Sequence, residues 1–280
     1  MFSKASLNFF SKKNRIIYKK YKKKPNLIEF IELIKFGLIP RPQYALGLLM
    51  AAHQAKQLGY KKISVFELGN FNLDGLIDIE HYIDDIKKII NIDFCVFGLD
   101  YRKGLPNTKF DKRDRMYGWS VSDYKFTLKE NLKKLKYAKL IVGDIKNTIP
   151  KLVKKYNFSL MPVAFVVSDV DYYTSTLNGL NILKMKPTNY VPRPIVYFDD
   201  QFMSSHFEGE YLAIKEFNKK NKNKLSLIGE FAEQLSISWK KWIFLGKRFY
   251  VYTNSNHPKY NQRYYNEISA QINKLQKFHL

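Results

Sequence analysis

Acidic side chains follow five apolar runs of the sequence, at the point where each run ends. Each run is short, holds β-branched or other apolar residues and is bounded by turn residues, which is typical of a buried strand. The acids, in chain order, are Glu67, Asp100, Asp144, the pair Asp169 and Asp171, and the pair Asp199 and Asp200. A single acid after a strand usually caps a helix or forms a turn. In open parallel sheets, however, ligands bind outside the carboxyl ends of the strands, so five acid-bearing ends predict a functional site.

A rim of carboxylates restricts the ligands that such a site can hold. A phosphate-rich cofactor requires backbone donors and cations, and the sequence has neither a GxxxxGK[ST] loop nor a complete GxGxxG loop. Carboxylates instead suit ribose hydroxyls, an ammonium group, a sulfonium charge or a divalent metal. The rim therefore argues against a P-loop nucleoside triphosphatase and favours a cationic or hydroxylated ligand.

The elements that position these acids alternate along the chain. Strands are expected over residues 63–68, 94–99, 140–142, 163–167 and 195–198. Helices are expected between them, as in the amphipathic stripe from Leu76 to Ile90. Near the end, residues 242–245 and 248–252 flank Gly246 and Lys247, which predicts a β-hairpin. The pattern predicts an α/β, Rossmann-like fold: a mostly parallel sheet with helices on both faces and a C-terminal antiparallel hairpin.

Composition divides the chain into four parts. We expect a basic tail over residues 1–24, a helical segment over 25–60, the α/β domain over 61–255 and a C-terminal extension over 256–280. The tail holds nine lysines or arginines, no acid and no apolar stripe that would dock on the domain. Its deletion is therefore expected to leave thermal stability and cofactor binding nearly unchanged.

The net charge of +23 is concentrated at the two ends of the chain. Such basic ends attract nucleic acid or an anionic surface, and a non-catalytic binding protein of this kind is the alternative function. Lysine far outnumbers arginine, whereas nucleic-acid readers rely on arginine for bidentate contacts. Nucleic acid is therefore the less favoured partner, and a solvated surface the more favoured reading.

Cysteine usage and hydropathy indicate a cytoplasmic protein. Cys95 is the lone cysteine, which excludes a disulfide framework and favours a reducing compartment. Apolar runs such as residues 44–52 are far shorter than the roughly 20 residues of a membrane-spanning helix, so no transmembrane segment is expected. No secretory signal is recognised in residues 1–10. A homo-oligomer is compatible with the sequence.

Four segments in order resemble class I S-adenosylmethionine-dependent methyltransferases, and most closely the macrocin O-methyltransferase group. Residues 98–106 are similar to that group's FDSFxGLP, residues 143–150 to its GDVxDTLP, and residues 169–176 to its DxDLYxST. Asp199-Asp200 is similar to its terminal DD, and Glu67-Leu68-Gly69 stands where the class has its first acidic loop. The likeness covers roughly residues 60–205.

The resemblance implies a cofactor site for S-adenosyl-L-methionine. Glu67, Gly69 and Asn70 would line the loop against its methionine part, with glycine permitting close backbone approach. Asp100 would accept hydrogen bonds from the ribose hydroxyls. Gly143 and Asp144 would lie beside the adenine.

The resemblance also implies a divalent cation, Mg²⁺ or a similar ion, held by Asp169, Asp199 and Asp200. The cation would orient a hydroxyl of a small, sugar-type acceptor and lower its pKa, with Asp169 as a base. His206, six residues beyond Asp200, is a further candidate base or substrate contact. Arg41, between two prolines, is a candidate to reach a carboxylate or the cofactor from outside the sheet.

Two features leave alternatives open. The glycine-rich loop of the class is thinned here to Gly69 and Gly75, and Phe71 is bulky where the cofactor is expected to approach. A degenerate member without activity is therefore retained as an alternative. The long irregular segment of residues 101–124 suits a lid or substrate loop, or else an insertion without a role.

Overall fold

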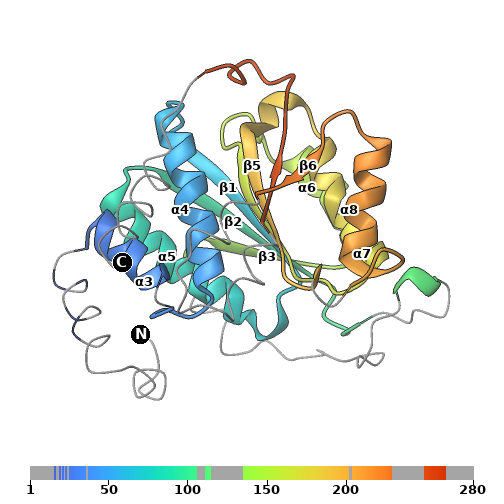
Figure 1. Cartoon of the computed structure of the whole chain (residues 1–280), viewed down its shortest axis with the longest axis horizontal. Helices are drawn as coiled ribbons and strands as arrows, with labels where there is room; N and C mark the ends of the chain where they lie inside the picture. The colour runs from blue at the N-terminus through green and yellow to red at the C-terminus, as the bar shows by residue number, and fades with distance from the viewer. Residues whose placement is uncertain are drawn as a thin grey trace, which may run out of the picture.

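A seven-stranded sheet runs through the described part of the chain (Figure 1). The computed structural model describes residues 16, 19, 21, 23, 25–35, 37–105, 111–114, 135–201, 204–228 and 249–262. The strands are β1 (Lys62–Leu68), β2 (Asp93–Asp100), β3 (Ala138–Val142), β4 (Val163–Ser168), β5 (Tyr190–Phe198), β6 (Leu225–Leu227) and β7 (Phe249–Tyr252). Their order in the sheet is β3-β2-β1-β4-β5-β7-β6.

Strands β1 to β5 are parallel, and β7 lies antiparallel between β5 and β6. The chain runs outward from β1 to β3 and then returns to β4, so the order reverses between β1 and β4. Such a reversal opens a crevice at the carboxyl ends of the strands. The predicted fold class is confirmed. The expected strand over 248–252 is present as β7, whereas the expected partner over 242–245 and its turn lie outside the described residues.

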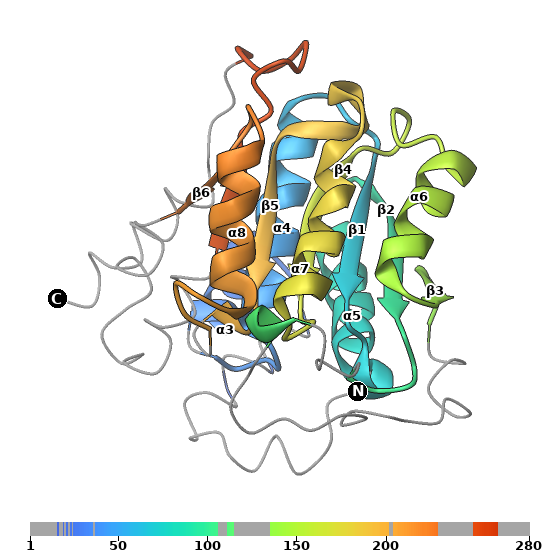
Figure 2. The ribbon, with the colours of Figure 1, turned by 90° about the vertical axis from the view of Figure 1, so that its right-hand side faces the viewer.

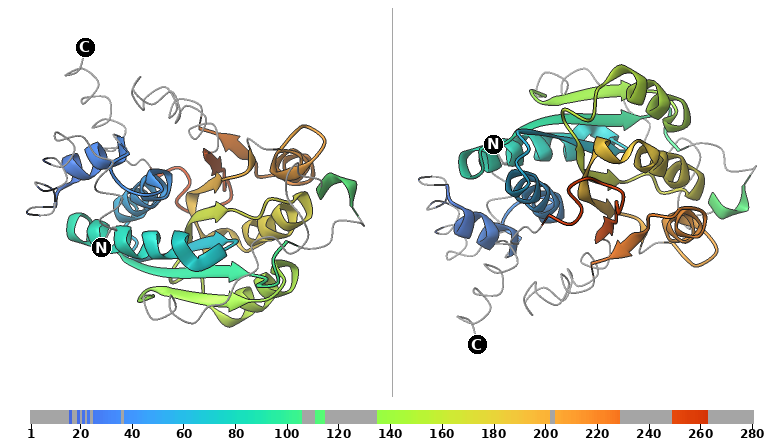
Figure 3. Two further views of the ribbon diagram at one scale, coloured as in Figure 1. Left: turned by 90° about the horizontal axis from the view of Figure 1, so that it is seen from below. Right: turned by 90° about the horizontal axis from the view of Figure 1, so that it is seen from above.

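Helices cover both faces of the sheet (Figure 3). One face packs on α4 (Pro42–Gln57) and α5 (Asp74–Ile89), and α3 (Leu27–Lys35) packs on α4. The other face packs on α6 (Ile145–Lys155), α7 (Tyr173–Gly179) and α8 (Gly209–Lys220). Successive strand residues point to opposite faces of the sheet and so belong to two hydrophobic cores. Val65 lies in the first core, on the side of α4 and α5, and Phe66 lies in the second, on the side of α6 and α8. Because helices cover both faces, all residues of β4 and all residues of β1 except Lys62 are buried. Within the described residues, no helix is apolar and long enough to cross a bilayer.

Local signals set several helix ends. The side chain of Asn26 accepts a hydrogen bond from the Glu29 N–H (3.0 Å) and caps the start of α3. The side chain of Asp144 accepts one from the Lys146 N–H (2.8 Å) and caps α6. Asn and Asp are both among the residues preferred at this position. Asp144 is thereby placed directly beyond the end of β3.

The N-terminal region differs from expectation at Tyr21. Ile16, Lys19, Tyr21 and Lys23 are helical, and Tyr21 is 1% exposed, with its ring stacked on Phe30 at a centroid distance of 5.8 Å. The expectation that nothing in residues 1–24 docks on the domain is therefore wrong at this residue. A lone aromatic ring within a lysine-rich run carries no apolar periodicity, so the sequence pattern gave no sign of the contact.

Replacing Tyr21 with alanine is expected to lower the free energy of unfolding by about 2 kcal/mol, because it removes a buried ring from the first core. Lys19→Ala, at an exposed position two residues away, is the matched control and should leave stability unchanged. Urea denaturation of the two variants measures the difference. Equal midpoints for Tyr21→Ala and Lys19→Ala would show that the ring contributes nothing.

Candidate functional site

The parallel strands all point toward one edge of the sheet (Figure 2). A cavity of about 530 Å³ lies at this edge. Residues that follow all five parallel strands line it, together with residues from the starts of α4, α5 and α6 and from α7. From the predicted site residues it brings together Glu67, Gly69, Asn70, Asp100, Asp144, Asp169, Asp199 and Asp200. The expected gathering of the acids at one edge is therefore observed.

Asp100 ends β2, and its carboxylate is held by two backbone donors. The Asn70 N–H donates to Asp100 Oδ2 (2.8 Å), and the Arg102 N–H donates to Oδ1 (2.6 Å). A carboxylate offers about four acceptor positions, so each oxygen retains room for one more donor. Fixed in this way against the cavity, Asp100 suits a ligand with two adjacent hydroxyl groups.

Glu67 is buried at the end of β1 and is 2% exposed. Its Oε2 accepts a hydrogen bond from Asn70 Nδ2 (2.6 Å). Burial raises the pKa of Glu67 to about 8, although Arg41 and the Asn70 bond oppose the shift. Gly75 makes room for this carboxyl, since a Cβ there would lie 1.8 Å from Glu67 Oε1.

Gly69 directly follows β1 and packs closely against the backbone that follows β4. Its φ is +84°, and a Cβ at this position would lie 1.7 Å from the Asp169 carbonyl oxygen. The glycine is therefore required first for close packing of the two strand ends. Gly69 also lines the cavity.

Gly143 and Asp144 take different positions relative to the cavity. Asp144 lines it as the cap of α6, whereas Gly143 is not among the described residues that line it. The Gly143 N–H donates to the Asp100 carbonyl (2.9 Å), which joins the ends of β2 and β3. Gly143 thus supports the edge that carries Asp100.

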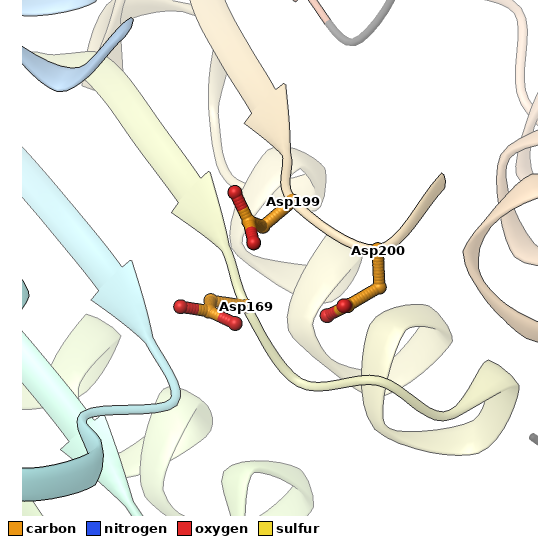
Figure 4. A group of neighbouring side chains, drawn as sticks. All are labelled: Asp169, Asp199 and Asp200. Atoms are coloured by element: carbon orange, nitrogen blue, oxygen red, sulfur yellow. The ribbon is translucent and has the colours of Figure 1, made fainter. Parts of the chain in front are cut away.

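Three carboxyl groups converge beyond the ends of β4 and β5 (Figure 4). One oxygen from each of Asp169, Asp199 and Asp200 lies within 4.8 Å of the other two. Burial, followed by the charges of Asp199 and Asp200, raises the pKa of Asp169 well above its ordinary value. Negative groups this close destabilise one another unless a cation or a proton neutralises them. The donor set is therefore suited to a divalent cation that prefers oxygen ligands.

Neighbouring side chains hold this acidic triad, the group Asp169, Asp199 and Asp200, in place. The Tyr197 hydroxyl donates to Asp199 Oδ1 (2.8 Å), and the Tyr44 hydroxyl lies 3.4 Å from Asp169 Oδ2 as a donor. These hydroxyls orient two of the three carboxylates.

Glu210 is a site residue that sequence reasoning missed. It is fully buried on α8, where its Oε2 accepts from the Asp200 N–H (2.9 Å) and its Oε1 from the Ser168 hydroxyl (2.7 Å). Burial raises the pKa of Glu210 well above its ordinary value. The sequence did hold a signal for Glu210. It lies four and seven residues before Ile214 and Phe217, on the apolar face of the helix, and a carboxyl group on an apolar face needs a hydrogen-bond partner.

Asp171 stood in the acidic rim but was given no role from sequence. It lines the cavity and is 8% exposed, with a left-handed φ of 58° that is uncommon for a residue other than glycine. Its N–H donates to Asp200 Oδ2 (3.3 Å). Burial and the charge of Asp199 raise the pKa of Asp171 to about 6.

His206 does not join the site. It is exposed on the turn before α8, its ring packs on Tyr211 at a centroid distance of 4.5 Å, and it is absent from the described lining of the cavity. Six residues of separation suggested that it would reach Asp200. The chain between them instead folds so that Ser204 packs under the start of α8, with the Tyr211 N–H donating to its hydroxyl (3.0 Å).

The segment proposed as a lid or substrate loop is described over residues 101–105 and 111–114. Asp114 accepts hydrogen bonds from the Thr174 N–H (2.6 Å) and hydroxyl (2.7 Å) at the start of α7. Arg113 donates to the Tyr173 hydroxyl (2.9 Å). Because Thr174 lines the cavity, residues 111–114 support one wall of the site.

Comparison of this chain with known proteins finds similar chains among solved structures. No protein-family model and no curated protein matches the sequence. The chain is similar to the O-methyltransferase NovP, with 14% identity, a TM-score of 0.49 and coverage of 75% of this chain and 78% of that one. It is similar to the calicheamicin methyltransferase CalS11, with 16% identity, a TM-score of 0.47 and coverage of 77% and 86%. It is also similar to the plantazolicin methyltransferase BpumL in complex with SAH, with 13% identity and a TM-score of 0.34. The match covers 88% of this chain and 92% of that one.

Proposed function

We propose that this protein is an S-adenosylmethionine-dependent O-methyltransferase that uses a divalent cation to methylate a small hydroxylated acceptor of sugar type. The observation that carries the proposal is the arrangement of carboxylates in one cavity. Asp100 lies at one end, beyond β2, and the acidic triad lies at the other, beyond β4 and β5. A cofactor held at the first end would place its reactive group toward the second.

The residues present fit the cofactor. The cavity of about 530 Å³ falls within the roughly 300–1,000 Å³ of small-molecule sites. Asp100 would bind the ribose hydroxyls, and Glu67 would face the positively charged methionine part. When bound, S-adenosylmethionine supplies a methyl group on a sulfonium, which oxygen nucleophiles attack.

The acidic triad fits a magnesium-type ion, because carboxylate oxygens converge and leave room for water and substrate. A cation held there would orient an acceptor hydroxyl and lower its pKa. Asp171, which lines the same cavity, would take the hydroxyl proton as the acceptor oxygen forms its bond to the methyl carbon. The methyl–sulfur bond of the cofactor would break in the same step, with S-adenosylhomocysteine as the leaving group. The sequence-based choice for the base was Asp169. With a cation bound, Asp169 would be one of its ligands, so Asp171 is the base proposed for the metal-bound enzyme.

Measuring the release of S-adenosylhomocysteine from S-adenosylmethionine tests the proposal. The purified protein would be given a panel of glycosides and sugar nucleotides, with magnesium and then with chelator. We expect acceptor-dependent release that requires the cation. Failure to bind the cofactor at millimolar concentration, combined with salt-sensitive binding of nucleic acid, would favour the non-catalytic alternative.

Asp100→Ala is expected to weaken binding of S-adenosylhomocysteine by about 2 kcal/mol, which is roughly thirtyfold, because charged hydrogen bonds to the ribose are lost. Asp93→Asn, at the exposed start of the same strand, is the matched control. Calorimetry on both variants checks the effect. Unchanged affinity in Asp100→Ala would remove Asp100 from the cofactor site.

A further inference from the structure

The cavity is acidic with a single exception. Eight carboxyl-bearing residues line it: Glu67, Asp74, Asp100, Asp144, Asp169, Asp171, Asp199 and Asp200. Arg41 is the one basic side chain among the described residues of the lining. This lone guanidinium is the one positively charged side chain of the described lining, and it can attract a negative group.

The backbone holds Arg41 in an unusual conformation at this place. Its φ is 36° and its ψ is 58°, in the left-handed region. A residue before proline normally adopts an extended conformation, and Pro42 follows directly. The bend is held on both sides: the Tyr44 N–H donates to the Arg41 carbonyl (2.8 Å), and the Tyr82 hydroxyl donates to the Pro40 carbonyl. Strain retained in this way is typical of functional sites.

The guanidinium is anchored and still has donors to offer. Arg41 Nη1 donates to Asp78 Oδ2 (2.7 Å), and among the described residues Asp78 is its one hydrogen-bond partner. The Arg41 side chain is 38% exposed and that of Asp78 is 11% exposed. A guanidinium carries five N–H donors in a fixed fork. Asp78 therefore fixes the side chain while other donors remain available to a ligand.

The surroundings of Arg41 match the methionine end of the proposed cofactor. Glu67 is among the charges that act on it, and Gly75, which packs against Glu67, lines the cavity with it. At neutral pH the methionine part of S-adenosylmethionine carries a sulfonium, an ammonium and one carboxylate. The acidic lining complements both positive groups, and Arg41, the one basic side chain of the described lining, complements the negative one.

We infer that Arg41 binds the carboxylate of the methionine part and makes the site selective for ligands that carry it. The inference rests on the proposed function. It predicts that the affinity for S-adenosylmethionine depends on the interaction between the methionine carboxylate and Arg41.

Decarboxylated S-adenosylmethionine tests this selectivity, because it lacks the carboxylate and keeps the sulfonium, the amine and the adenosine. Wild-type protein is expected to bind S-adenosylmethionine at least about tenfold more tightly than the decarboxylated form, as for a hydrogen bond between charged groups. Arg41→Gln should lose this preference by weakening only the binding of the carboxylated ligand. Arg41→Lys should keep part of it.

Arg193→Gln is the matched control, because Arg193 packs on Tyr260 and does not line the cavity. It should keep the wild-type preference. A preference for the carboxylated ligand that persists in Arg41→Gln would overturn the inference and leave the proposed function standing. Wild-type protein that binds neither ligand would overturn both.

Discussion

Asp199→Asn is expected to lower the rate of methyl transfer about a thousandfold, because one charged ligand of the cation is lost and the acceptor hydroxyl is no longer activated. The substitution is nearly isosteric. Asparagine keeps an oxygen that can accept from the Tyr197 hydroxyl, which bonds Asp199 Oδ1 at 2.8 Å. The change therefore removes charge from the acidic triad and retains its local packing.

Although Asp199→Asn should lower activity, it should raise the stability of the protein when no cation is present. Asp199 and Asp200 both raise the pKa of Asp169, which shows that the three carboxyl groups repel one another. Removing one charge relieves this repulsion, so Asp199→Asn should melt at a higher temperature than wild-type protein in chelator. Magnesium should raise the melting temperature of the wild type and have little effect on the variant.

Thermal scans and turnover assays in magnesium and in chelator give both readouts. Asp93→Asn, which removes an exposed carboxylate paired with Lys87, is the control for loss of one charge. Wild-type protein that is equally stable and equally active with and without divalent cations would end the metal proposal. It would leave Asp169 and Asp171 as metal-free candidates for the base.

Glu67→Gln is expected to change how stability depends on pH in the cofactor-free protein. Burial raises the pKa of Glu67 from 4.5 to about 8 in the folded state. Between these two pKa values the Glu67 carboxyl is protonated in the folded state and ionised in the unfolded chain. The contribution of Glu67 to stability is fully present below the unfolded pKa and is lost as the pH rises through the folded pKa.

The size of this effect follows from proton linkage. Between about pH 4.5 and pH 8, one retained proton lowers the free energy of unfolding by up to about 1.4 kcal/mol per pH unit. Glutamine is permanently neutral, so Glu67→Gln should lose this slope and be more stable than wild-type protein at pH 8. Urea denaturation at several pH values measures it. Parallel curves for the two proteins would show that Glu67 is ionised in the folded state.

Features fixed by neighbours along the chain were predictable from the sequence. The runs that became β1 to β5 were recognised from their apolar residues. The caps formed by Asn26 and Asp144 likewise follow from local residue type. Acids directly after these strands had to meet at one edge, because parallel strands share their carboxyl ends. That rule alone placed Asp100 and the acidic triad on the same cavity.

Features fixed by residues distant in sequence were not predictable. Glu210 reaches the Asp200 N–H only because α8 packs beside the end of β5, and Tyr21 is buried only because α3 lies beneath it. Distance along the chain misled in the case of His206, where the turn before α8 directs the residue to solvent. Arg41 was expected to reach a carboxylate or the cofactor, but residue type did not indicate the left-handed backbone that places it.

The central claim is that the carboxylate-lined cavity binds S-adenosylmethionine. Calorimetric titration of S-adenosylhomocysteine into the wild-type protein tests it most directly, because no acceptor has to be known. We predict saturable binding at a single site with micromolar affinity. The absence of any binding heat at millimolar ligand, over a range of temperatures, would contradict the assignment of this cavity to the cofactor.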